Sequence, residues 1–268
     1  MKSILHKAVQ KQIELMRLEV WKEELINHAP PILWFGDIQS RKERILTIAA
    51  NPSRWEVLYR NGRPRERVRI LKPNEYHHDI LLRDNLADEI LKSYNRYFTH
   101  DPYTKWFGKR NEPHNVEGFL RGMKASYYEM SGYENIALHA DLFPFPTRRD
   151  YSEIYPIVKE DLFTASWAKD VLFGIIDRVN PVCIVVFGRG NTNALHNDLI
   201  GSSSRTLTEM FQSSLGNSAY YSYCNIQTRI RNYQCCCIST NLGNPIPFTK
   251  NELTEFGRHV RLGSGLSL

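Results

Sequence analysis

Four short apolar runs constrain the fold of this chain more than any other feature of its sequence. They span residues 44–50, 135–142, 181–188 and 233–240. A glycine, proline or asparagine closes each run, and runs of this length indicate strands covered on both faces. Stretches with helical spacing separate them, over residues 76–98, 115–130 and 157–178. Because strands that alternate with helices form parallel sheets, the sequence predicts an α/β protein with a mainly parallel sheet.

Both ends of the chain are predicted to be helical. Residues 4–27 carry apolar side chains at helical spacing, and the prolines of "HAPP" end that helix. A last helix is expected over 250–261 with Thr249 as its N-cap, and an antiparallel strand at 219–230 is expected to lead into 233–240. Because neither a repeat nor a linker divides the 268 residues, we expect one domain over 1–268, with an N-terminal helix (1–28) and an α/β core (29–262).

The composition suggests a partner class and a compartment. A formal net charge of +6 suits a polyanionic partner such as nucleic acid, although many basic proteins bind none. The N-terminus turns polar too soon for a signal peptide, and no apolar run is long enough to span a bilayer. We therefore expect a cytoplasmic monomer without a membrane partner.

The five cysteines do not show a metal-binding pattern. They are Cys183, Cys224, Cys235, Cys236 and Cys237. Since no CxxC pair occurs, the usual zinc spacings are excluded and a cysteine-ligated iron–sulfur cluster is disfavoured. Buried reduced thiols are the simplest interpretation, and we expect neither a metal nor another cofactor.

Ligands of parallel α/β sheets gather at the carboxyl ends of the strands, so the loops after residues 50, 142, 188 and 240 are of interest. The loop "FGRGNTN" lacks the third glycine of a dinucleotide fingerprint, because Asn193 stands there. Gly188 and Gly190 still allow close backbone approach, and Arg189 could reach a phosphate. An ordinary strand-to-helix turn explains this loop equally well.

The loop "AANPS" holds neither a Walker motif nor a nucleophile elbow. The amide of Asn51 can orient a water molecule but is too weak a base to deprotonate it. Such placement suits cleavage of an N-glycosidic bond through an oxocarbenium-like state. An Asx-turn ahead of Pro52 is the structural alternative. In the next loop, "LHADLFPFPT", Asp141 ends a strand and could either read a ligand or cap the turn.

Together these loops resemble the uracil-DNA glycosylase superfamily. In that family the first core strand ends in Asp or Asn before Pro, matched here by Asn51 and Pro52, and the next ends in a residue that reads the flipped base, matched by Asp141. "IVVFGRG" resembles the third strand and "STNLGNPIPFT" the intercalation loop. The resemblance covers roughly residues 30–260 through about four short motifs. Two departures are Ala49 in place of the usual glycine and the absence of histidine from the fourth loop.

The resemblance implies a three-layer αβα domain with a central, mainly parallel four-stranded sheet, and a monofunctional DNA glycosylase. Asn51 would position the water, and Asn241 or Thr240 would hold the leaving base. The implied base-binding residues are Ala50, Pro52, Ser53, Asp141, Phe143 and Trp106. The implied DNA contacts are Arg63, Arg65, Arg148, Arg189, Asn191, Asn244 and Ile246. The segment 60–72, with six basic residues, would grip phosphates or form a solvated loop.

Asp141 stands where the family usually has asparagine, and this suggests the substrate. An ionised aspartate only accepts hydrogen bonds, so it would repel uracil O4 but accept from the N4 amine of cytosine. Because excision of ordinary cytosine would destroy the host's own DNA, we expect a modified cytosine, as in defence against phage. The alternatives are a uracil-DNA glycosylase of base excision repair with an unusual reader, a non-catalytic DNA-binding module, and an α/β hydrolase acting on a nucleoside or another small ligand.

Overall fold

Two compact units make up the chain in the computed structural model. The described residues are 1–150, 153–154, 166–200, 208–214, 216–240, 242 and 248–266. Unit 1 comprises Met1–Asp37, Ala50–Pro102 and Ala140–Arg178, and unit 2 comprises Ile38–Ala49, Tyr103–His139 and Val179–Leu268. Within the described residues, none of the helices is both long enough and apolar enough to cross a membrane.

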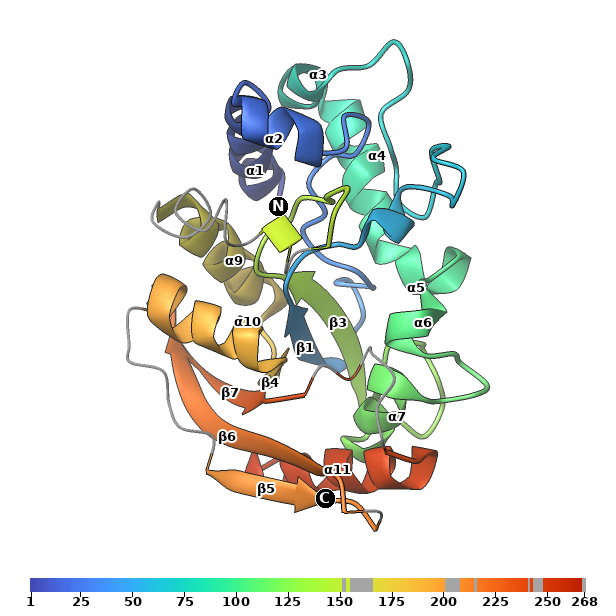
Figure 1. The fold of residues 1–268 in the computed structure, drawn as a ribbon, viewed down its shortest axis with the longest axis vertical. Coiled ribbons are helices and arrows are strands. Elements are labelled where there is room, and N and C mark those ends of the chain that lie inside the picture. Colours follow the sequence, from blue (N-terminus) through green and yellow to red (C-terminus); the bar gives the residue numbers. More distant parts are fainter. Residues whose placement is uncertain are drawn as a thin grey trace. The chain divides into compact units, whose positions relative to one another are not determined.

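A seven-stranded sheet runs in the order β2-β3-β1-β4-β7-β6-β5. Figure 1 labels these strands except β2. Its strands are β1 (Glu43–Ala49), β2 (Ala125–Ser126), β3 (Asn135–Asp141), β4 (Cys183–Phe187), β5 (Glu209–Gln212), β6 (Ser218–Gln227) and β7 (Asn232–Ile238). The pairs β2–β3, β1–β4 and β4–β7 are parallel, whereas β6 pairs antiparallel with both β7 and β5. The α/β class is confirmed, and so is the antiparallel strand that leads into β7.

The prediction of a four-stranded sheet is wrong. The four apolar runs form β1, β3, β4 and β7, but β2 adds an edge beside β3, and β6 and β5 extend the sheet beyond β7. β2 has only two residues, and β5 is mostly exposed, so neither carries the apolar pattern of a buried strand. Backbone pairing with a neighbouring strand defines both of them, and the local sequence does not display that pairing.

The central strands are buried at nearly every position, as their apolar sequences require. Each position of β3 and β4 is buried. Thr47 of β1 is a polar exception whose hydroxyl lies 2.6 Å from the Tyr127 hydroxyl and 2.9 Å from His139 Nδ1. These contacts satisfy a buried hydroxyl group and assign His139 to the core of unit 2.

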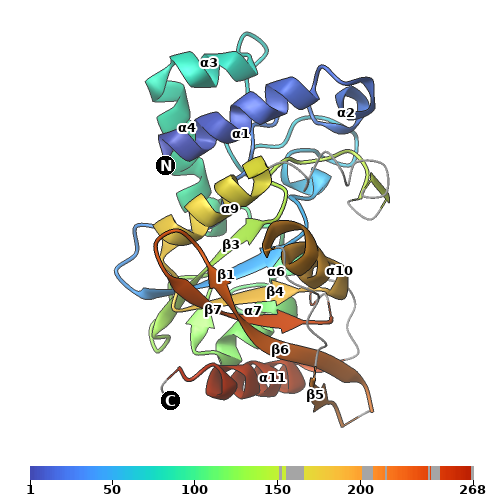
Figure 2. The same ribbon diagram turned by 90° about the vertical axis from the view of Figure 1, so that its left-hand side faces the viewer.

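Two helices of unit 2 pack closely against each other, α7 (Asn115–Gly122) and α11 (Lys250–Gly263) (Figures 1 and 2). The predicted N-cap of α11 is confirmed, since Thr249 Oγ1 accepts from the Glu252 backbone N–H at 3.3 Å. The predicted helix over 115–130 is wrong beyond Gly122. Lys124 adopts a left-handed φ of 57°, which ends the helix and turns the chain into β2. Unit 2 also contains α6 (Thr104–Phe107) and α10 (Arg189–Asn193).

Two long helices predicted for unit 1 are each divided. The segment 4–27 forms α1 (Lys2–Leu15) and α2 (Glu19–Glu24), separated at Leu18, whose backbone is extended. The segment 76–98 forms α3 (His77–Leu82), α4 (Asp84–Asn95) and the start of α5 (Tyr97–His100), with extended backbone at Arg83. Helix α1 contacts both α3 and α4 (Figure 2). The described helix α9 (Ser166–Val179) matches the second half of the helix predicted over 157–178.

Candidate active site

Asn51 lies in unit 1, two residues after the end of β1 at Ala49. The loop that holds it leads into a short 3-10 helix, Arg54–Glu56. Ser53 caps this helix, since its hydroxyl accepts from the Trp55 backbone N–H at 3.3 Å. Pro52 is buried, while Ala50, Asn51 and Ser53 are half-buried. The loop is therefore held at a defined place, and Ser53 acts there as a helix cap.

Three oxygen atoms of unit 1 fix the amide of Asn51. Its Nδ2 donates to Thr147 Oγ1 at 2.9 Å and also lies 3.4 Å from the Phe145 carbonyl and 3.3 Å from the Pro52 carbonyl. Thr147 Oγ1 donates in turn to the Arg149 carbonyl at 2.8 Å, so it accepts from Asn51. Because only the N–H₂ group suits these acceptors, the amide oxygen Oδ1 faces the other way. Asn51 thus presents a fixed hydrogen-bond acceptor.

The loops after β1 and β3 are joined within unit 1. The Phe143 backbone N–H donates to the Ala50 carbonyl at 2.9 Å, and this bond lies beside the contact of Asn51 with the Phe145 carbonyl. Asp141, the last residue of β3, is 3% exposed. The structure thus brings together the loops that carry Asn51 and Asp141. The Phe143 ring is fully buried, 5.4 Å from Trp21 and 4.8 Å from Phe145, and so occupies a core position.

A second carboxyl group lies within the electrostatic reach of Asp141, and sequence analysis missed it. Glu56 is 3% exposed, accepts from the Tyr97 hydroxyl at 2.5 Å and lies 3.7 Å from Arg67 Nη1. Burial raises the pKa of Glu56 to about 7, and the charge of Asp141 adds to the rise against the opposing effects of Arg67 and Tyr97. The sequence hints at the burial of Glu56 in one way, because this acid stands between Trp55 and the apolar pair Val57-Leu58.

The raised pKa of Glu56 predicts that this residue contributes more to stability at pH 5 than at pH 8. Between pH 4.5 and 7 the folded chain keeps a proton that the unfolded chain releases, so the free energy of unfolding falls as pH rises through this window. The loss attributable to Glu56 is about 3 kcal/mol at most. Glu117, whose pKa burial also raises to about 7, acts in the same direction. His28 and His77, whose pKa values burial lowers, act in the opposite direction. Urea unfolding at both pH values measures the sum.

The variant Glu56→Gln is expected to remove its own share of this pH dependence. Glu129→Gln, which alters an exposed acid, is the matched control and should keep the wild-type slope. Equal slopes in wild type and Glu56→Gln would contradict the assignment.

Three residues of unit 2 were predicted to contact the base or the DNA, and two of them already make contacts within unit 2. The Trp106 ring is half-buried in α6, 4.6 Å from the His139 ring and 4.8 Å from the Phe107 ring. Asn191 uses its Nδ2 to donate to the Phe187 carbonyl at 2.6 Å, which secures the turn after β4. Arg189 is exposed at the start of α10. Of these three, Arg189 keeps the exposure that a phosphate contact needs.

Residues of the fourth loop are described only in part. The predicted positions Asn241, Asn244 and Ile246 lie outside the described residues. Leu242 is fully buried, and Phe248 is 9% exposed with its ring 5.9 Å from that of Phe211. Both are therefore core residues of unit 2, and neither side chain is exposed enough to insert between DNA bases.

Ion pairs occupy much of the basic segment 60–72. Arg65 pairs with Asp101, Arg67 with both Asp101 and Glu56, and Arg69 with Glu75 and Glu89. The remaining basic residues of the segment, Arg60, Arg63 and Lys72, are exposed, as is Arg148 outside it. The segment thus combines internal ion pairs with exposed cations, and the predicted contact of Arg65 with DNA competes with its bond to Asp101.

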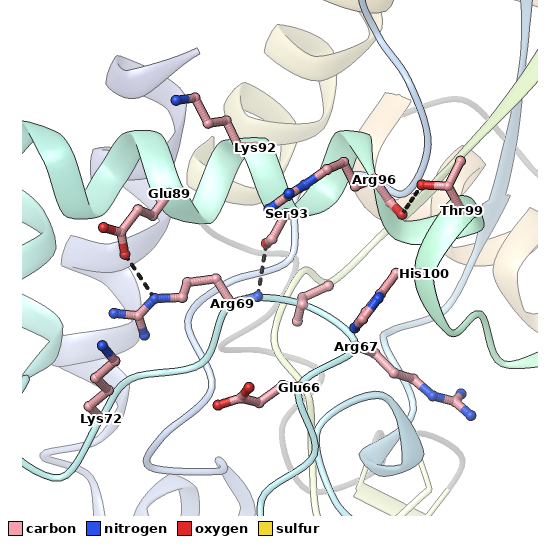
Figure 3. A pocket seen from close by; sticks show the side chains of 11 residues that line it. Glu66, Arg67, Arg69, Lys72, Glu89, Lys92, Ser93, Arg96, Thr99 and His100 are labelled. Carbon is pink, nitrogen blue, oxygen red and sulfur yellow. Dashed lines mark hydrogen bonds and ion pairs between the residues drawn. The ribbon is translucent and has the colours of Figure 1, made fainter.

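A cavity of about 540 Å³ lies between residues 66–72 and helix α4 in unit 1 (Figure 3). Its lining includes the basic residues Arg67, Arg69, Lys72, Lys92, Arg96 and His100 and the acids Glu66 and Glu89. A second cavity of about 570 Å³ lies against His28, Ile70 and Tyr76. Neither of these two cavities is lined by Asn51 or Asp141, but the first gathers positive charge on an open surface.

Comparisons with known proteins leave the function to be argued from this geometry. No protein-family model matches the sequence, and a search of curated proteins finds no match either.

Proposed function

We propose that the protein is a monofunctional DNA glycosylase, which takes a base out of the DNA stack and hydrolyses its N-glycosidic bond to leave an abasic site. The orientation of Asn51 is the observation that carries the proposal. With Nδ2 bound to Thr147 and facing two carbonyl groups, Oδ1 is the atom that can accept a hydrogen bond from water. An amide held in this way places a water without needing to deprotonate it.

In the proposed reaction the glycosidic bond weakens first, and the sugar gains oxocarbenium character. The base leaves with the bonding electrons, and the water held by Asn51 adds to C1′ of the sugar. The proton that this water loses passes to the departed base or to solvent, so the products are the neutral base and the abasic sugar. A hydrogen-bond donor, Thr240 or Asn241, would stabilise the negative charge on the departing base. Because no lysine stands at a position of the recognised motifs, the sugar–phosphate chain stays intact.

Asp141 supports a cytosine-type base as the substrate. Its carboxylate can accept from the exocyclic amine of cytosine, whereas a uracil carbonyl would be repelled. Glu56 holds a carboxyl group nearby whose pKa is raised to about 7. We propose a modified cytosine, and protection of a host against phage DNA as the purpose.

The proposal is tested with duplexes that carry uracil, cytosine, hydroxymethylcytosine or glucosylated hydroxymethylcytosine at one position. After incubation, alkali cleaves the strand at abasic sites. We expect cleavage with a modified cytosine and a shift towards uracil in Asp141→Asn, because an amide can donate to O4. Cleavage at uracil alone by wild type would indicate a repair enzyme, and unchanged preference in Asp141→Asn would contradict its reading role. Tight binding of DNA without abasic sites would indicate a non-catalytic DNA-binding module. Hydrolysis of free nucleosides would indicate a hydrolase that acts on small molecules.

The basic cavity of Figure 3 predicts where part of the DNA backbone binds. Lys72, Lys92 and Arg96 are exposed along its lining. Replacing all three by alanine is expected to weaken binding of any duplex by about tenfold or more and to reduce the salt dependence of affinity. Fluorescence anisotropy over a salt series measures both. The matched control replaces Lys22, Lys109 and Lys124, exposed lysines outside the cavity, and should bind like wild type.

A further inference from the structure

Three side chains that can bind a metal ion, two thiols and one imidazole, come together within unit 2 beside strands β6 and β7. They are His196, from the π-helical segment Ala194–Ile200 after α10, Cys224 of β6 and Cys237 of β7. Their ligand atoms all lie within 4.8 Å of one another. Helix α10 contacts β7, which brings the following segment to this face of the sheet. Sequence spacing does not reveal the group, because strand pairing and a helix–sheet contact assemble it.

A fourth thiol adjoins the group. Cys235 lies directly opposite Cys224 in the antiparallel pair, and its Sγ is 3.9 Å from Cys237 Sγ. Residues two apart on a strand share a face, so Cys235 and Cys237 point the same way. Cys236 points to the opposite face. The triple cysteine run therefore supplies two thiols to the cluster and one to the other side of the sheet.

The separations of these atoms fit a tetrahedral metal ion. Zinc binds thiolate sulfur at about 2.3 Å and histidine nitrogen at about 2.0–2.1 Å, so neighbouring ligand atoms lie about 3.8 Å apart for two sulfurs and about 3.5 Å for sulfur and nitrogen. Here Cys224 Sγ and Cys237 Sγ are 4.0 Å apart, and Cys237 Sγ lies 3.7 Å from His196 Nε2. The remaining separation within the group of three is no more than 4.8 Å, so shifts of about 1 Å or less would bring these three ligands to the expected distances. Cys235 lies outside that group and would have to move closer to complete the coordination.

A polar atom beside the cluster adds an independent observation. Ser222 pairs with Cys237 across the strands and so projects from the same face. Its side chain is buried, at 4% exposure, and its Oγ has no hydrogen-bond partner among the described residues. Buried hydroxyl groups are normally hydrogen-bonded, so this one indicates a bound water or ligand at the cluster.

We propose that His196, Cys224 and Cys237 bind one Zn²⁺ ion, with Cys235 as the fourth ligand. On binding, the thiols release their protons to solvent, and the imidazole coordinates through its neutral Nε2. The ion joins β6, β7 and the helical segment after α10, so its role is to stabilise unit 2. This inference does not depend on the proposed glycosylase activity.

The test measures zinc in the full-length protein purified without chelators. We expect about one zinc per chain by mass spectrometry of the metal, and its release by a mercurial that titrates thiols. Cys224→Ser, Cys235→Ser, Cys237→Ser and His196→Ala should each lose most of the metal. Cys236→Ser, on the other face of the same strand, and Cys183→Ser, a buried thiol beside Ser264, are the matched controls and should keep it.

A second measurement covers variants that fail to fold. Wild-type protein reconstituted with Co²⁺ should show visible ligand-field bands and near-ultraviolet thiolate charge-transfer bands of a tetrahedral site. Removal of the metal should lower the melting temperature, and restored Zn²⁺ should recover it. Full zinc retention in Cys235→Ser would contradict the assignment of Cys235 as the fourth ligand. Metal-free protein without cobalt bands, bound Cu⁺ instead of zinc, or a disulfide between Cys224 and Cys235 would overturn the zinc site.

Discussion

Asn51→Ala is expected to reduce the rate constant of base excision by about 10²–10⁴-fold, because the variant loses the atom that places the attacking water. Single-turnover assays on the preferred duplex, with abasic sites revealed by alkali, measure this constant directly. DNA affinity should change little, since Asn51 is half-buried and its Nδ2 is bound within unit 1. A rate within a few-fold of wild type would exclude Asn51 as the water-positioning residue.

Substitutions of Thr147, which accepts a hydrogen bond from Asn51, test whether the orientation of the Asn51 amide matters. Thr147→Val keeps the shape of the buried side chain but removes the oxygen that accepts from Nδ2 at 2.9 Å. The amide then loses its fixed orientation, and we expect a rate loss of about tenfold with unchanged affinity for DNA. Thr147→Ser restores the oxygen and should recover most of the rate. Equal rates in the valine and serine variants would show that orientation of the amide does not matter.

Gly257→Ala is expected to destabilise the protein by about 3 kcal/mol or more, or to prevent its folding. A Cβ atom at this position of α11 would lie 1.8 Å from the Phe119 carbonyl oxygen of α7. Since that oxygen belongs to a helix backbone, relief requires the two helices to separate. The gain in helix propensity, about 1 kcal/mol, is too small to offset this. Gly122 of α7 makes the reciprocal contact, with a Cβ atom 1.9 Å from the Thr254 carbonyl oxygen.

Gly190→Ala is the matched control for the helix contact. Gly190 also lies in a helix, α10, but a Cβ atom there would have no neighbour within 4 Å. We expect a melting temperature close to that of wild type for Gly190→Ala, and a fall of about 6–12 °C for Gly257→Ala. Similar melting temperatures for both variants would contradict the close packing of α7 on α11.

The sequence by itself determined the α/β class, the four central strands and the start of the last helix. These features depend on neighbouring residues in the sequence. An apolar run indicates a buried strand, and the side chain of Thr249 caps helix α11, which begins at the next residue. Asn51 and Asp141 are candidates from the sequence because each follows or ends a strand whose carboxyl end was recognisable, and their role in a site stays a prediction.

Only the tertiary structure decided the edges of the sheet, the breaks in the long helices and the neighbours of each polar side chain. The burial of Glu56 depends on Tyr97 and Arg67, which are distant in sequence, and the pairing of Arg65 depends on Asp101. The cluster of His196 with Cys224 and Cys237 depends on the register of β6 and β7 and on the position of the helical segment after α10. Local patterns encode which face of an element is apolar, but they do not encode which distant element covers that face. The contacts with that distant element determine the hydrogen bonds and ion pairs of the polar side chains, and therefore their chemistry.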